Sequence, residues 1–206
     1  MTGRLLQTVI RRAESLAAEL GPDAVPDSVL LDYWARDLPD GEEMNRVEEH
    51  LFACGDCSAR LGEMATLGSG LATLVRQGRL SGIVSRSILN RLQRDGARVR
   101  MFWLAPGETV PCAVYPGDDL IVTVLRADLS DVETVTLAVT GPDDSPFTRY
   151  DDVPVSGARG EVLWATPAAV VSQLPSMRLE LTLTTAGAAP TELGRYVLEH
   201  SASPPA

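Results

Sequence analysis

The residues with the clearest chemical potential are His50, Cys54 and Cys57, within the segment His50-Leu51-Phe52-Ala53-Cys54-Gly55-Asp56-Cys57. In a helix, positions i, i+4 and i+7 share one face, so the imidazole and the two thiols can converge on one point. One nitrogen and two sulfur ligands suit a zinc ion, which prefers tetrahedral coordination by these atoms. Gly55 would let the backbone bend so that both sulfurs reach the metal. The spacing therefore predicts a metal site.

Two other interpretations of these residues stay open. Cys54 and Cys57 would also serve as small buried apolar residues beside a surface histidine, or as a C-x-x-C redox pair. A closed zinc site needs a fourth ligand, which would be a carboxylate of Asp23, Asp27 or Asp32, a ligand from the C-terminal half, or water. Without any of these, the site would be vestigial.

The elements that must position these residues are predicted to be helices. Apolar residues recur at helical spacing over residues 5–20, and a second helix begins at Pro26-Asp27-Ser28. A third begins at Glu42 and runs towards Leu61, so it carries all three candidate ligands. Leu71, Leu74 and Val75 continue the helical spacing, and residues 83–93 predict one more short amphipathic helix.

Residues beyond about 100 are predicted to be strands. Residues 178–184 alternate strictly between polar and apolar side chains, which is typical of a half-buried strand. We expect Cys112, Trp103 and Trp164 to be buried in the core of this half. The other predicted strands, separated by Gly-, Pro- and Asp-rich turns, are residues 99–104, 109–114, 120–126, 133–140, 161–165 and 194–199.

This organisation predicts an α+β protein with two domains. Residues 1–96 would form a small helical bundle and residues 97–200 an all-β sandwich, because several short strands separated by turns favour that architecture. Residues 201–206 are expected to be a disordered tail.

The composition excludes several classes of protein. The chain has 206 residues and a net charge of -10, and its 18 basic residues are all arginine. An acidic balance argues against direct nucleic-acid binding. No apolar run reaches the ~18 residues of a membrane span, and the N-terminus lacks a secretory segment. Three cysteines cannot form a disulfide framework. Phosphate-loop, dinucleotide-binding and nucleophile-elbow motifs are absent, so we expect a cytoplasmic protein that is not an enzyme.

The charge is distributed unevenly along the chain. Residues 14–63 carry 13 acidic residues against 3 arginines, whereas residues 71–100 carry 7 arginines against one acid. Residues 101–206 hold 14 acids and 5 arginines. Solvated helix faces would account for this pattern, and so would acidic surfaces that steer a basic partner.

Three successive segments resemble a known family. They are residues 26–33 (PDSVLLDY), 38–43 (LPDGEE) and 47–57 (VEEHLFACGDC), and their order resembles the zinc-binding anti-sigma factor domain. That family has a short helix, an acidic turn, a helix ending in H-L-x-x-C-x-x-C, and a further helix. Many members place a fourth ligand just before the short helix, where this chain has Val25. The resemblance covers residues 25 to 60.

The resemblance implies an inhibitor of an extracytoplasmic-function-type sigma factor. Such a domain would occlude the sigma surfaces that contact RNA polymerase and promoter DNA until a signal releases them. The β-domain would then act as a sensor of a soluble cue, a dock, or a homodimerisation unit. The alternative is a cytoplasmic interaction or sensory module with a degenerate zinc fold and no sigma partner. Candidate partner-binding residues on the apolar helix stripes are Leu5, Val9, Leu71, Leu74, Val75, Ile88 and Leu92.

Overall fold

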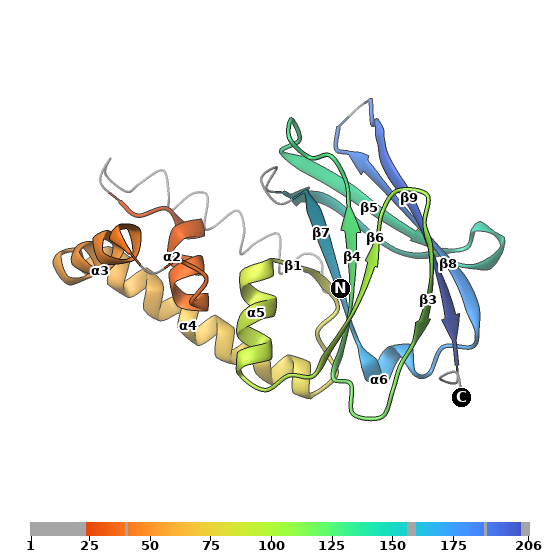
Figure 1. Cartoon of the computed structure of the whole chain (residues 1–206), viewed down its shortest axis with the longest axis horizontal. Coiled ribbons are helices and arrows are strands. Elements are labelled where there is room, and N and C mark those ends of the chain that lie inside the picture. Colours follow the sequence, from red (N-terminus) through yellow and green to blue (C-terminus); the bar gives the residue numbers. More distant parts are fainter. Residues whose placement is uncertain (1–23, 40, 156–159, 188, 203–206) are drawn as a thin grey trace. The chain divides into compact units, whose positions relative to one another are not determined.

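The computed structural model describes residues 24–39, 41–155, 160–187 and 189–202 (Figure 1). Helices occupy the N-terminal part and two β-sheets the C-terminal part, which confirms the predicted change from helices to strands. The chain divides into two compact units, Met1–Ala72 with Ser87–Arg94 and Thr73–Arg86 with Asp95–Ala206. The helix expected over residues 5–20 lies outside the described residues.

The first unit is built from the helices α2 (Asp27–Ala35), α3 (Glu42–Ala53), α4 (Gly55–Arg76) and α5 (Arg86–Arg94). Of these, α2 and α3 begin close to the predicted positions. Glu42 and Glu43 in the first turn of α3 complement the partial positive charge of a helix N-terminus. The prediction that the last helix begins at residue 83 is wrong, because Gly82–Val84 forms strand β1 and pairs with β7 (Glu161–Pro167). None of the described helices is long and apolar enough to cross a membrane.

Polar contacts join α5 to the segment around α2. The Asn90 amide donates to both carboxylate oxygens of Asp37, at 3.0 and 2.9 Å. Arg94 Nη2 lies 3.1 Å from the same carboxylate, and the Arg91 guanidinium lies 4.8 Å from the ring centroid of Trp34. Two arginines of the basic segment 71–100 are therefore engaged within this unit, Arg94 with the Asp37 carboxylate and Arg91 with the Trp34 ring.

Gly68 of α4 leaves room for the Trp34 indole, since a Cβ at this position would overlap its six-membered ring. Alanine favours a helix interior by about 1 kcal/mol over glycine, but moving a large rigid ring costs about 1–3 kcal/mol. We expect Gly68→Ala to lower the free energy of unfolding of the helical unit by about 1–2 kcal/mol. Urea denaturation followed by far-UV circular dichroism measures this change.

Gly70→Ala is the matched control, because a Cβ at Gly70 meets no atom within 4 Å. This substitution should raise the free energy of unfolding by up to about 1 kcal/mol. Equal effects of the two substitutions would contradict the packing of Trp34 against Gly68.

The second unit contains a four-stranded sheet of order β1-β7-β4-β2 and a five-stranded sheet of order β3-β9-β8-β5-β6. All seven predicted strands are present. β6 was not predicted because it is an edge strand whose side chains are mostly exposed, so its sequence lacks an apolar alternation. Ser201, expected in the tail, ends β9. The bounds of the remaining elements are β2 (Val99–Leu104), β3 (Thr109–Ala113), β4 (Leu120–Arg126), β5 (Thr134–Thr140), β6 (Pro146–Pro154), α6 (Ala168–Val171), β8 (Met177–Thr185) and β9 (Glu192–Ser201).

Side chains from both sheets form one hydrophobic core. Cys112 and Trp164 are buried in it, as predicted. Trp103 was expected there too, but it is 40% exposed. It lies on the edge strand β2, where the guanidinium groups of Arg86 and Arg126 each lie 5.1 Å from the centroid of its ring. The Trp103 indole is thus held by cation–π contacts with two arginines and not by burial in the core.

Candidate metal centre

His50, Cys54 and Cys57 lie together in the structure. Their candidate ligand atoms are all within 4.8 Å of one another, and His50 Nε2 is 3.3 Å from Cys57 Sγ. Within the described part of the chain this is the one group of three or more histidine, cysteine or acidic residues that could hold a metal ion. The predicted convergence of these side chains is confirmed.

The backbone brings them together by a different route from the one expected. A single helix from Glu42 to Leu61 was predicted, but α3 ends at Ala53 and α4 begins at Gly55. Cys54 lies between the two helices in an extended conformation (φ -112°, ψ 106°), and its N–H donates to the His50 carbonyl at 2.8 Å. The bend is thus at Cys54, one residue before the glycine that was expected to provide it.

The corner between α3 and α4 gives each ligand a distinct position. His50 is in the last turn of α3 and Cys57 is in the first turn of α4. A helix N-terminus favours a thiolate, because its unpaired backbone N–H groups carry partial positive charge. Ser58 holds the corner closed, since its hydroxyl donates to the Leu51 carbonyl at 2.6 Å.

Cys57 has the most strongly perturbed environment of the three. Its side chain is fully buried, and this burial raises the pKa of the Cys57 thiol above its usual value, although a hydrogen bond with the Val25 backbone lowers it. The neighbouring Cys54 raises the pKa further. In the absence of a cation the thiol is therefore held neutral, and binding of a metal ion would release its proton.

Arg60 also contacts one of the candidate ligands, Cys57, and it was not predicted to do so. It lies one turn after Cys57 on α4, with Nη1 at 3.9 Å from Cys57 Sγ and at 3.3 Å from the Val25 carbonyl. Its other terminal nitrogen forms an ion pair with Asp27. The i, i+3 spacing of Cys57 and Arg60 is the sequence signal that could have indicated this contact. Arg60 thus joins the segment before α2 to the cysteine corner.

The donor set fits zinc. Zinc–sulfur bonds of about 2.3 Å and zinc–nitrogen bonds of about 2.0–2.1 Å in a tetrahedron separate donor atoms by roughly 3.3–3.8 Å. The separation of 3.3 Å between His50 Nε2 and Cys57 Sγ is already in this range. The other separations between the ligand atoms are at most 4.8 Å. One imidazole and two thiols would therefore hold the ion and leave a fourth position for water or another ligand.

Of the three carboxylates suggested as a fourth ligand, the two that the structure describes, Asp27 and Asp32, do not join the group. Asp27 pairs with Arg60, and Asp32 accepts a hydrogen bond from the Ser87 hydroxyl. Asp23 lies outside the described residues. The backbone of Val25 lies beside Cys57 instead, which is the place where the resembling family has its additional ligand.

The predicted partner-binding residues differ in their exposure. Val75 and Leu92 are buried, whereas Leu71, Leu74 and Ile88 are half-buried. Leu5 and Val9 lie outside the described residues. Phe52 and Leu67 were not among the predicted partner-binding residues, yet they are 93% and 56% exposed. In the sequence these two residues continue an apolar helix pattern, so nothing distinguished them from core residues.

Comparisons with known proteins give no family for the chain. No protein-family model and no curated protein matches it. Among solved structures, the N-terminal domain of phage TP901-1 ORF48 aligns with 50% of this chain and 98% of its own, with 9% identity and a TM-score of 0.33. Extracellular domains 3-5 of Drosophila OTK align with 46% of this chain and 33% of their own, with 13% identity and a TM-score of 0.24. Both scores are too low to carry an argument about fold or function.

Proposed function

We propose that the protein is a zinc-binding anti-sigma factor. Its helices would form a small bundle that binds an extracytoplasmic-function-type sigma factor, and its two sheets would form a β-sandwich with a sensory or docking role. The observation that carries the proposal is the meeting of His50, Cys54 and Cys57 at the α3–α4 corner. The resembling family has the H-L-x-x-C-x-x-C pattern at the end of one helix with a further helix after it, and the order of α3, the three ligands and α4 agrees with that arrangement.

Zinc would act as a structural element in this proposal. When bound, the ion supplies a crosslink between the end of α3 and the start of α4. His50 and Cys57 hold the two helices together, and Cys54 holds the bend. Arg60 and Asp27 then tie the start of α2 to the same corner. This arrangement would fix the helix surface that the sigma factor contacts.

The surface beside the corner supports a protein partner. Phe52 lies in the sequence midway between His50 and Cys54 and is almost fully exposed, and Leu67 is exposed farther along α4. Large exposed apolar side chains are typical of interfaces, where aromatic residues contribute much of the binding energy. The exposed acidic residues Glu48 and Glu49 of α3 would favour a partner with basic residues.

Inhibition would follow from occlusion. A sigma factor held by this protein cannot contact RNA polymerase or promoter DNA with the same surface, so transcription stops in proportion to the amount of complex. A signal that weakens the complex would restore transcription. The proposed location is the cytoplasm, where sigma factors act, and no catalytic activity is needed.

Co-purification tests the partner. The tagged full chain, co-expressed in turn with each extracytoplasmic-function-type sigma factor of the source organism, should elute as an equimolar complex with one of them. A tagged β-sheet protein of similar charge is the control for capture by electrostatics alone. If no extracytoplasmic-function-type sigma factor of the source organism co-purifies, the alternative of an interaction module with a degenerate zinc fold is preferred. The valine in place of the family's fourth ligand is the observation that favours that alternative.

A further inference from the structure

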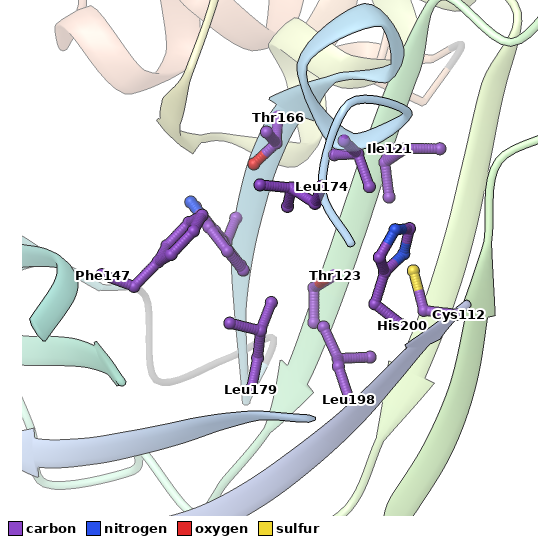
Figure 2. Close-up of a pocket in the computed structure, with 11 residues that line it drawn as sticks. Cys112, Ile121, Thr123, Phe147, Thr166, Leu174, Leu179, Leu198 and His200 are labelled. Carbon is purple, nitrogen blue, oxygen red and sulfur yellow. The ribbon is translucent and has the colours of Figure 1, made fainter. Parts of the chain in front are cut away.

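A hollow lies at one end of the core, between the two β-sheets (Figure 2). β4 and β7 of the four-stranded sheet supply two cross-strand pairs to its lining, Ile121 with Thr166 and Thr123 with Trp164. The five-stranded sheet supplies Cys112 with its parallel partner His200, which Figure 2 shows side by side. All of these residues belong to the second compact unit, so the hollow is separate from the candidate metal centre.

The lining contains buried polar atoms without hydrogen-bond partners. His200 is only 4% exposed and Thr166 only 7%, yet neither ring nitrogen of His200 nor the hydroxyl of Thr166 has a hydrogen-bond partner within the described chain. These three are the only buried side-chain nitrogen or oxygen atoms in that state among the described residues. Folded proteins pair nearly all such atoms, so the three atoms are available to hydrogen-bond with a molecule that enters the hollow.

The remaining lining determines the charge of the ligand. No acidic residue and no arginine lines the hollow. Burial raises the pKa of the Cys112 thiol to about 11, although Arg100 lowers it, so Cys112 is uncharged at neutral pH. A charged ligand would lose its hydration here without meeting an arginine or a carboxylate of opposite charge. An uncharged ligand with a hydroxyl, carbonyl or amide group would instead satisfy imidazole and hydroxyl, each of which can donate and accept.

The hollow has a small enclosed part and a mouth that opens to solvent. The enclosed volume of the hollow is only about 20 Å³. The enclosed part therefore fits one small polar group. The body of a ligand would lie at the mouth, against Leu174 and Phe147. Phe147 is 38% exposed, and its ring stands edge-on to that of Trp164, with 6.4 Å between the centroids.

We propose that this hollow is a binding site for a small uncharged organic molecule that hydrogen-bonds with His200 or Thr166 and packs its apolar body against Phe147 and Leu174. The site is independent of the proposed sigma binding. It would give the β-sheet unit a ligand that the sequence motifs did not indicate.

Two probes of nearly equal shape test the site. 4-Methylphenol carries a hydroxyl that toluene lacks, and the imidazole nitrogen resonances of the full chain report binding. The chain has two histidines, and His50, in the other unit, is the internal control. We expect 4-methylphenol to shift the His200 resonances saturably and to bind about fivefold more tightly than toluene, which corresponds to one net hydrogen bond. The His50 resonances should not move.

Thr166→Val keeps the shape of the side chain and removes its hydroxyl. It should reduce the preference for 4-methylphenol over toluene without unfolding the sheets, since it deletes an unpaired buried hydroxyl. Two results would overturn the proposal. Equal affinity for both probes would show an apolar cavity only, and no saturable shift of His200 would show a hollow that holds water only.

Discussion

Replacing Cys57 with serine is expected to abolish zinc binding and to unfold the helical unit. Cys57 is the fully buried ligand in the first turn of α4, and it contacts both His50 and Arg60. In small zinc domains the metal contributes on the order of 10–16 kcal/mol of apparent binding free energy at neutral pH, and that energy drives folding. Removal of one of three protein ligands should therefore reduce zinc from one equivalent to near zero and lower the helical signal in far-UV circular dichroism.

Cys112→Ser is the matched control for this experiment. Cys112 is also a buried cysteine, but it lies on β3 in the other unit. This variant should keep one equivalent of zinc, and His50→Ala should lose the metal as Cys57→Ser does. Elemental analysis of the purified proteins provides the measurement. A wild-type zinc content near zero, after expression with added zinc, would show that the site is vestigial.

Removal of the Phe52 side chain is expected to weaken sigma binding by about 30-fold or more, the size of an interface hot spot of about 2 kcal/mol. The side chain is 93% exposed, so Phe52→Ala removes almost no packing from the free protein. Its thermal unfolding should match that of the wild type. The affinity of each variant for the sigma factor, measured by calorimetry, tests this expectation.

Phe147→Ala provides the comparison, because Phe147 is the other exposed phenylalanine and lies on the β-sheet unit. It should leave the affinity for the sigma factor unchanged. If both substitutions weakened the affinity for the sigma factor equally, the effect of Phe52→Ala would not be specific to the proposed interface. An unchanged affinity of Phe52→Ala would remove Phe52 from the interface.

The spacing of His50, Cys54 and Cys57 was enough to predict that they cluster. It was not enough to predict that the helix breaks at Cys54. A histidine followed by cysteines at i+4 and i+7 converges on a helix, and it also converges across a corner at Cys54. Apolar periodicity runs through residues 47–61 without interruption, so it could not reveal the corner. The Arg60 contacts with Asp27 and Val25 join residues more than 30 positions apart, and no local pattern reports such a contact.

The strands were predictable to within a few residues where turns bound an apolar run. Their pairing was not predictable from the same patterns. His200 lies beside Cys112 because β3 and β9 run parallel, although their residues are far apart in the sequence. The hollow and its unpaired polar atoms arise from that pairing. The edge strand β6 is mostly exposed, so its sequence shows little apolar alternation and did not predict a strand.

The most direct test of the central claim is transcription in vitro. RNA polymerase loaded with the extracytoplasmic-function-type sigma factor that co-purifies with this protein should transcribe its promoter, and an equimolar amount of the zinc-loaded full chain should stop that transcription. Polymerase carrying the housekeeping sigma factor should remain active in the same reaction. Undiminished transcription in the presence of excess zinc-loaded protein, with every extracytoplasmic-function-type sigma factor of the source organism, would contradict an anti-sigma function.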